Sequence, residues 1–262
     1  MANYKTITVT LFPNYVEIEL NRPEVHNALT PEMIVELTRF FQSIPSTFLC
    51  VIVKGKGKSF CSGADLNWMK ESLEYDSQKN YHDVEALYTL FETIDCCPIP
   101  VLTAVQGTVL GGGMGLIAAS DYVIAEQETR FSLSEVTLGL IPACVAPFLI
   151  PKIGMSWCRA LFLSAERFDA KKAYSIGLIH EVVSDTNTLE STVSRLRSNI
   201  LKASPQASRV AKHFLRHTSP FDLPKTASLS IQTLADLRQT PEAQEGIRAF
   251  LEKRSPHWNF MV

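Results

Sequence analysis

Two patterns of hydrophobic and polar residues divide the chain near residue 185. In the first part, short runs rich in β-branched residues alternate with stretches that carry apolar residues at helical spacing. These patterns predict strands over residues 7–11, 16–20, 49–55, 100–107, 121–126 and 178–183, and helices over residues 31–44 and 81–94. Strands that are linked through helices usually run parallel, so the alternation indicates an α/β core.

After Ser184 the strand pattern stops, and apolar residues recur only at helical spacing. Pro205 and Pro241 stand near the starts of two predicted helices, a position that tolerates the missing N–H of proline. No glycine- and serine-rich linker separates the two parts. We therefore predict a core domain over residues 1–185 and, over residues 186–262, a helical region that packs on the core or on a neighbouring subunit.

Composition and charge exclude several function classes. With 46% hydrophobic and 20% charged residues, the chain of 262 residues is typical of a globular protein with a sizeable core. The formal net charge of −2 and the absence of lysine or arginine runs argue against a nucleic acid or a membrane as partner. The six cysteines lack a disulfide-framework spacing, the N-terminus lacks an export signal, and no apolar run is long enough to span a membrane. We therefore expect a cytoplasmic protein with reduced thiols.

A cluster of four glycines, Gly111, Gly112, Gly113 and Gly115, lies in the apolar segment VLGGGMGLIAAS. Leu116 occupies the place of the last glycine in a dinucleotide-binding GxGxxG motif, which excludes that motif. The segment follows a predicted strand and opens a helix of small residues. Its first N–H groups are then free to meet negative charge, although the glycines could equally serve close packing between helix and strand.

A second glycine-containing turn, Ser62 to Asp65, follows the predicted strand at 49–55 and also opens a helix. Two such turns, each placed after a strand, can direct one N–H group each toward a single carbonyl oxygen. That arrangement is an oxyanion hole, which stabilises the negative charge that develops on an oxygen during a reaction.

Ordered motifs give the chain a resemblance to the enoyl-CoA hydratase/isomerase (crotonase) superfamily. The segments that resemble it are NRPEVHNAL at 21–29, FCSGADLNWM at 60–69, VQGTVLGGGMGLIAASD at 105–121, SEVTLGLIP at 134–142 and FLEKRSP at 250–256. The resemblance covers nearly the whole chain and implies a spiral of repeated ββα units with a helical C-terminal region. It also implies acyl-CoA thioester substrates, no cofactor beyond the coenzyme A of the substrate, and a homo-oligomer that is a trimer or a dimer of trimers.

By position, the resemblance assigns the two oxyanion N–H groups to Ala64 and Gly112 and the catalytic acid/base to Glu135. It implies a wider set of substrate-binding residues: Val25, His26, Ala28, Ser62, Asp65, Leu66, Trp68, Gly111, Gly115 and Pro142. The sequence around Glu135, a short strand followed by an apolar stretch, favours partial burial, a raised pKa and a role in proton transfer. The alternatives are a helix-start glutamate for Glu135 and a core aromatic residue for Trp68.

The main departure from the family pattern is Gly115, which stands where typical hydratases carry a second glutamate. Isomerases of the family work with one glutamate. The motifs nevertheless resemble most those of bacterial hydratases of the 3-methylglutaconyl-CoA type, some of which share this glycine. We therefore expect a hydratase of a branched or carboxylated enoyl-CoA, with an enoyl-CoA isomerase and a non-catalytic acyl-CoA-binding protein as alternatives. Gly115 is expected to leave space near Glu135 for the acyl group or a water molecule.

Two further groups of polar residues carry weaker signals. His213 and His217 lie one helical turn apart without a candidate for a third ligand, so we expect no metal site. The second glycine turn is surrounded by Lys54, Lys56, Lys58 and Lys70. These lysines either bind the phosphates of coenzyme A or belong to a solvated loop.

Overall fold

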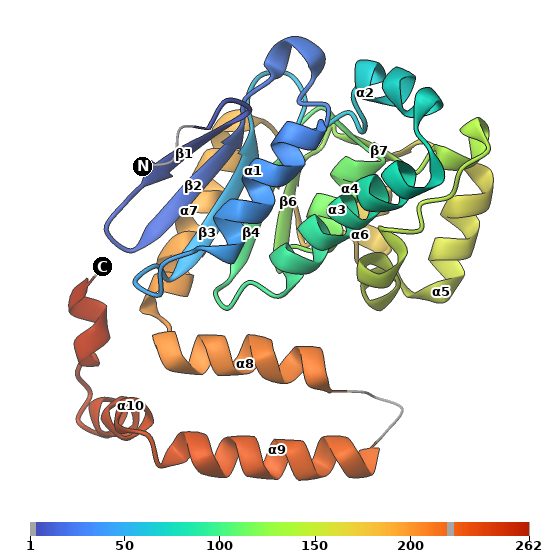
Figure 1. Cartoon of the computed structure of the whole chain (residues 1–262). Coiled ribbons are helices and arrows are strands. Elements are labelled where there is room, and N and C mark those ends of the chain that lie inside the picture. Colours follow the sequence, from blue (N-terminus) through green and yellow to red (C-terminus); the bar gives the residue numbers. More distant parts are fainter. Residues whose placement is uncertain (1–3, 219–222, 262) are drawn as a thin grey trace.

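The computed structural model describes residues 4–218 and 223–261 (Figure 1). A six-stranded sheet forms its centre, built in spatial order from β1 (Ile7–Leu11), β2 (Tyr15–Leu20), β3 (Cys50–Gly55), β4 (Val101–Val105), β6 (Tyr122–Glu126) and β9 (Glu181–Val183). β1 is antiparallel to β2, and all other neighbouring strands are parallel. The six predicted strands are all present, and their parallel pairing confirms the predicted α/β core.

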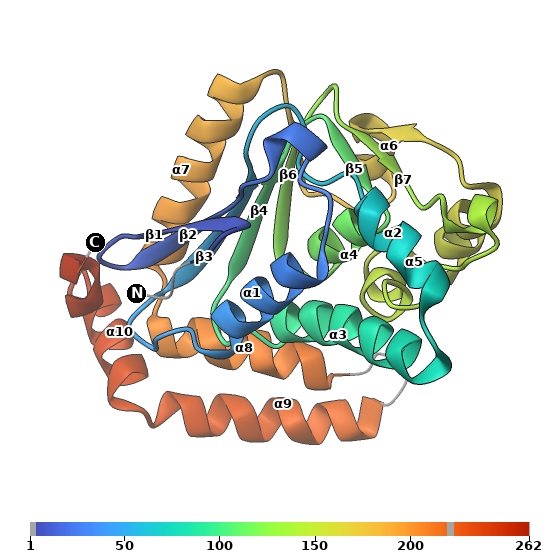
Figure 2. The same cartoon turned by 45° about the horizontal axis from the view of Figure 1, so that its top comes forward.

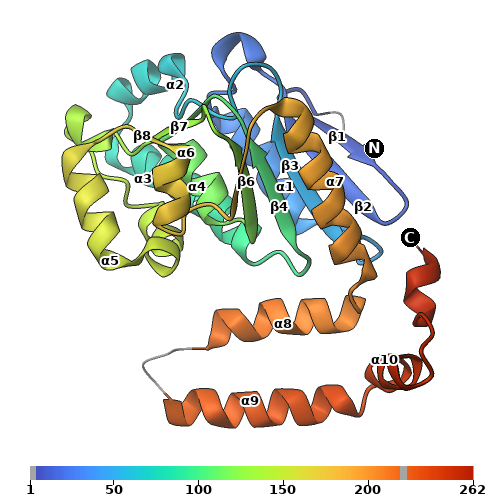
Figure 3. The same cartoon turned by 180° about the vertical axis from the view of Figure 1, so that it is seen from behind.

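Helices cover both faces of this sheet. α1 (Pro31–Gln42), α3 (Ser77–Asp95) and α4 (Gly112–Ala118) lie on one side and α7 (Thr186–Lys202) on the other. α2 (Leu66–Glu71), α5 (Ala146–Ser164) and α6 (Ala170–Ser175) complete the helices of this part of the chain. Successive side chains of a strand point to opposite faces. Val51 and Val53 of β3 accordingly join the core that α1, α3 and α4 complete, whereas Ile52 joins a smaller core beneath α7. Figure 3, seen from behind, shows α7 crossing the face opposite to α1.

Capping side chains explain where the long helices begin. The side chains of Thr30, Asp76 and Asp185 each accept a hydrogen bond from a backbone N–H in the first turn of α1, α3 and α7 respectively. Such caps satisfy N–H groups that have no partner within the helix. The polar residue before each apolar pattern therefore fixes the helix start.

A second, smaller sheet connects the elements that carry the glycine turns. It consists of β5 (Thr108–Leu110), β7 (Arg130–Ser132) and β8 (Phe168–Asp169), in that order. β5 leads directly into α4, and β7 leads into the short 3-10 helix η3 (Glu135–Leu138). β5 and β7 are parallel neighbours, so the chain segments that leave them start from the same edge.

The C-terminal region is helical, as predicted, but its first helix belongs to the core. Leu189 and Val193 of α7 are 4% and 2% exposed and pack on Ile52 and Ile124 of the sheet. Packing on the core is one of the two arrangements predicted for residues 186–262, and α7 adopts it. The region that extends from the core consists of α8 (Pro205–His217), α9 (Leu223–Arg238), α10 (Pro241–Leu251) and the 3-10 helix η4 (His257–Met261).

Figures 1 and 2 show α8 and α9 side by side below the sheet, with α10 turning upward toward the C-terminus. The sequence patterns predicted α8 and α10, and α9 is an additional helix between them. Within the described ranges, no helix is both long and apolar enough to cross a membrane.

Candidate active site

The two glycine turns lie in contact because the chain segments before them pair. Cys61 and Val109 form a parallel β-bridge, in which Leu110 N–H donates to Cys61 O at 3.0 Å. Each turn begins directly after its paired segment. A Cβ atom built on Gly111 would lie 3.7 Å from Cα of Gly63, a van der Waals contact. Gly111 also has a positive φ of 47°, which glycine adopts readily and other residues rarely do.

Each turn presents one N–H group without a protein acceptor. On the first turn, Leu29 N–H donates to Gly63 O at 2.7 Å and Asp65 N–H donates to Leu29 O at 2.9 Å. The N–H of Ala64, between them, points away from Leu29, as alternate groups of a paired strand do. Gly112 is the first residue of α4, where an N–H has no partner within the helix. Within residues 4–218 and 223–261, neither of these two N–H groups donates to a protein atom.

Glu135 lies against the same glycine turn. Gly111 N–H donates to Ser132 O at 3.2 Å, which joins the start of α4 to the end of β7. A Cβ atom on Gly111 would lie 3.5 Å from Oε1 of Glu135. Oε2 of Glu135 is buried and has no hydrogen-bond partner among the described residues. Burial raises the pKa of this carboxyl group above its ordinary value, against a smaller opposing effect of its own backbone N–H.

The structure contradicts the expected space at Gly115. A Cβ atom on Gly115 would lie 2.2 to 2.6 Å from three atoms of the Phe91 ring. Phe91 belongs to α3 and is fully buried, in edge-to-face contact with Phe148 of α5. The ring therefore fills the volume that a side chain at position 115 would need. The prediction that Gly115 leaves room for the acyl group or a water molecule was wrong.

Part of the predicted binding set gathers on the segment 21–29 and the first glycine turn. Ser62 N–H donates to His26 O at 3.0 Å, and Ser62 Oγ donates to Val25 O at 3.4 Å. Val25 and His26 are exposed beside this turn, whereas Ala28 is buried, with its carbonyl oxygen accepting from Arg22.

Asn27 was not singled out from the sequence. Its buried side-chain amide donates to two backbone oxygens, those of Lys56 and Ser59, and so fixes the loop.

The remaining predicted binding residues have different surroundings. Asp65 caps α2 and forms a 2.8 Å ion pair with Arg22. Burial raises the pKa of its carboxyl group, but the ion pair and the capping hydrogen bonds together hold that pKa below the ordinary value. Trp68 is 9% exposed and its Nε1 donates to Asp83, so core packing describes it better than an open wall. Leu66 is 81% exposed, so its side chain is accessible beside this turn. Pro142 is buried in the loop before α5.

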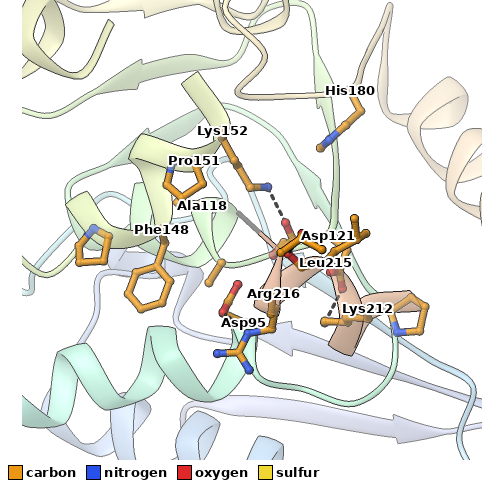
Figure 4. A pocket seen from close by; sticks show the side chains of 15 residues that line it. Asp95, Ala118, Asp121, Phe148, Pro151, Lys152, His180, Lys212, Leu215 and Arg216 are labelled. Carbon is orange, nitrogen blue, oxygen red and sulfur yellow. Dashed lines mark hydrogen bonds and ion pairs between the residues drawn. The ribbon is translucent and has the colours of Figure 1, made fainter. Parts of the chain in front are cut away.

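Two charged features lie apart from the free N–H groups. Lys54 forms ion pairs with Glu190 and Glu17, which favours a structural role over phosphate binding for this lysine. A cavity of about 740 Å³ lies at the opposite end of α4 from Gly112 (Figure 4). There Lys152 Nζ donates to the carbonyl oxygens of Ile117 and Ser120 at the C-terminal end of the helix.

The comparisons with known proteins agree with this architecture. The model of the enoyl-CoA hydratase/isomerase family matches residues 13–260. The 2,3-dehydroadipyl-CoA hydratase of Escherichia coli (strain K12) is 33% identical over 243 residues, which cover 91% of this chain and 92% of that protein. An enoyl-CoA hydratase structure from Shewanella pealeana is 34% identical, with a TM-score of 0.91 over 97% of this chain and 96% of that one.

A further solved structure, Pseudomonas aeruginosa AtuE, is 29% identical and has a TM-score of 0.94 over 97% of this chain and 100% of that chain. These matches extend over both the α/β core and the helical C-terminal region, so they confirm the predicted crotonase-type fold. The chain belongs to the enoyl-CoA hydratase/isomerase family.

Proposed function

We propose that this chain is an enoyl-CoA hydratase that adds water across the 2,3 double bond of an acyl-CoA thioester, with Glu135 as its single acid/base. The relatives named enoyl-CoA hydratases support this reaction in general. The observation that carries the assignment to Glu135 is its unpartnered Oε2, buried beside the turn that presents the Gly112 N–H. A desolvated carboxyl group with a raised pKa suits proton transfer near neutral pH.

In the proposed reaction, each proton has a defined donor and acceptor. The thioester oxygen accepts hydrogen bonds from the N–H groups of Ala64 and Gly112, which stabilise negative charge on it. The carboxylate of Glu135 removes a proton from water while the water oxygen bonds to C3 and electrons move onto the thioester oxygen. Glu135 then returns that proton to C2, and the carbonyl re-forms. One carboxylate therefore suffices, and the reaction needs no cofactor beyond the coenzyme A of the substrate.

We propose a branched or carboxylated acyl group for the substrate. The name of the Escherichia coli relative, 2,3-dehydroadipyl-CoA hydratase, supports a carboxylated acyl end. Because Phe91 fills the volume next to Gly115, the acyl branch does not sit there. It would extend instead along the exposed apolar residues that follow Glu135, which are Leu138, Leu140 and Ile141. Turnover of straight, branched and carboxylated 2-enoyl-CoA substrates, compared by kcat/KM, tests this part of the proposal.

The alternative function is an enoyl-CoA isomerase, which the same three groups would support. In that reaction Glu135 would move a proton between C2 and C4, and no water would enter the product. Incubation with a branched 2-enoyl-CoA in water labelled with heavy oxygen separates the two reactions. A hydratase yields a 3-hydroxyacyl product with the label at C3. A product with only a shifted double bond and no oxygen label would reject the hydratase, and binding without turnover of either kind would indicate an acyl-CoA-binding protein.

A further inference from the structure

We propose that Leu29 is the positioning residue that sets the relative placement of the two oxyanion N–H groups. This inference rests on the proposed function only in that both groups must meet one thioester oxygen. Leu29 touches neither the substrate nor Glu135 in this proposal. Its backbone holds the turn that carries the Ala64 N–H, and its side chain contacts the residue that carries the Gly112 N–H.

The backbone of Leu29 fixes Ala64 from both sides. Leu29 N–H donates to Gly63 O at 2.7 Å, and Leu29 O accepts from Asp65 N–H at 2.9 Å. The peptide groups before and after Ala64 are therefore both hydrogen bonded to the same residue. With these two bonds formed, the Ala64 N–H has to point to the other side of the turn.

The side chain of Leu29 reaches the second N–H group. A Cβ atom built on Gly112 would lie 2.6 Å from Cδ1 of Leu29, closer than real Cβ contacts come. The tip of Leu29 therefore rests directly on the backbone of Gly112. Any larger residue at position 112 would collide with Leu29, which explains the glycine there independently of its place at the start of α4.

Leu29 itself has little freedom to move. Its side chain is 1% exposed, and α1 begins two residues later with a Thr30 cap and Pro31 in its first turn. On the other side, Asn27 anchors the preceding loop through the backbone oxygens of Lys56 and Ser59. Because the chain is fixed on both sides of Leu29, its side chain can keep the two turns at a constant separation. Catalytic groups need placement within about 0.5 Å, and a 1 Å misplacement can cost about 10²-fold in rate.

The test shortens this side chain and compares the effect with an equal loss elsewhere in the core. Leu29→Ala removes the contact with Gly112 and leaves the backbone hydrogen bonds possible. Leu37→Ala is the matched control, because Leu37 of α1 is also 1% exposed in the same core but lies outside the candidate site. Leu29→Met is the conservative variant, since methionine retains the length and volume of leucine. All variants are assayed at a temperature where circular dichroism shows each of them folded.

Two readouts separate positioning from stability. The first is kcat with a 2-enoyl-CoA, which we expect to fall roughly 10- to 10²-fold in Leu29→Ala and less than about 3-fold in Leu29→Met and Leu37→Ala. The second is the ultraviolet band of a bound β-ketoacyl-CoA, a thioester whose enolate absorbs light. We expect this band to weaken or shift in Leu29→Ala alone. Equal losses in Leu29→Ala and Leu37→Ala on both readouts would overturn the proposal.

A compensating variant extends the test. If Leu29→Ala vacates the space on Gly112, a methyl group introduced there should partly refill it. We expect Leu29→Ala combined with Gly112→Ala to recover part of the enolate band, whereas Gly112→Ala alone weakens it. If Leu29→Ala does not fold, Leu29→Val also lacks the δ-carbons and takes its place. The β-ketoacyl-CoA band does not require hydration, so it tests Leu29 even if the wild-type chain proves inactive on 2-enoyl-CoA.

Discussion

A carboxyl oxygen buried without a partner is costly to a folded protein, and Glu135 Oε2 is such an atom. Glu135→Gln keeps the shape of the side chain but removes its ability to exchange a proton. We expect kcat to fall at least about 10²-fold, the usual contribution of a general acid/base, while the Kd for a saturated acyl-CoA changes little. Isothermal titration and steady-state kinetics measure the two quantities. A variant with near-normal turnover would remove Glu135 from the mechanism.

The raised pKa of Glu135 predicts a specific pH dependence. Because the carboxylate must accept a proton from water, kcat/KM should fall as the pH decreases through the pKa of Glu135. Burial raises this pKa, so the acid limb of the profile should have its midpoint above 4.5, the ordinary value of a glutamate. A midpoint at or below 4.5 would contradict the assignment.

The same shift predicts how Glu135 affects stability. A carboxyl group whose pKa is raised in the folded state favours its protonated form, so its ionisation destabilises the fold. The free energy of unfolding of the wild type should fall relative to Glu135→Gln as the pH rises from 4.5 through the raised pKa, and the difference should stay constant above it. Urea denaturation of both proteins at pH 4 and pH 7 measures this. An equal stability difference at both values would indicate that the charge is not desolvated.

Gly115 and Phe91 form a contact pair that also allows a prediction. A Cβ atom on Gly115 would lie 2.2 Å from the Phe91 ring, so a methyl group has no room there. Gly115→Ala should therefore destabilise the fold by about 1–3 kcal/mol, as overpacking does. In a Phe91→Leu background the added cost of Gly115→Ala should be much smaller, since leucine lacks the ring atoms. Thermal unfolding of the four proteins gives the coupling. Additive effects would show that the ring moves aside freely.

The pair also shows what sequence could and could not predict at this scale. Ala64, Gly112 and Glu135 follow strand ends with local patterns, and the structure brings the three segments together. Phe91 is different, because it reaches Gly115 from another helix and nothing in its own surroundings indicates that contact. Leu29 was overlooked for the same reason, since its role depends on where two distant turns meet.

At the scale of elements, α4 connects the candidate site to the charged cavity at its other end. Lys152 Nζ donates to two carbonyl oxygens there, the position where a positive charge suits the helix dipole. Burial lowers the pKa of Lys152 to about 8, partly offset by Asp121 and Asp95, and Lys212 adds to the lowering. His180 and Arg216 also line this cavity (Figure 4).

Lys152→Met should therefore change stability in a pH-dependent way. In the wild type the folded state releases the lysine proton near pH 8, whereas the unfolded chain holds it to about 10.5. The unfolded state binds more protons between these values, so the stability of the wild type should rise relative to the variant over this range, by up to about 3 kcal/mol. Parallel denaturation curves at pH 7.5 and pH 10 provide the measurement. If the difference in stability between the wild type and Lys152→Met did not depend on pH, the pKa of Lys152 would be the same in the folded and unfolded states.

Strands and helices could be predicted where each has its own apolar pattern. The surface that an element packs against could not be predicted in the same way. The core strands and the helices α1, α3, α7, α8 and α10 all have clear apolar periodicity. The surface on which α7 packs could not be predicted, because an apolar helix face can pack on a sheet or on a partner subunit equally well. In the structure, Leu189 and Val193 pack on the face of the sheet that carries Ile52.

For the whole molecule, the helices beyond α7 carry more exposed apolar side chains than a monomer normally shows. Ile231 and Leu234 of α9 are 73% and 54% exposed, and Phe250 and Leu251 of α10 are 82% and 71% exposed. Large apolar side chains exposed in this number on neighbouring helices are typical of an interface. A closed homo-oligomer, proposed here as a trimer or a dimer of trimers, would bury these faces without leaving an open end.

Light scattering coupled to size-exclusion chromatography tests this assembly. We expect the wild type at micromolar concentration to elute as a multiple of the 29.2 kDa chain. Ile231→Asp together with Leu234→Asp places two charges on the apolar face and should shift the protein toward smaller species. Gln232→Lys is the control, because Gln232 is an exposed polar neighbour already hydrogen bonded to Asp236, and a lysine there can pair with the same carboxylate. A monomeric wild type, or an unchanged mass in the double aspartate variant, would show that α9 does not hold the subunits together.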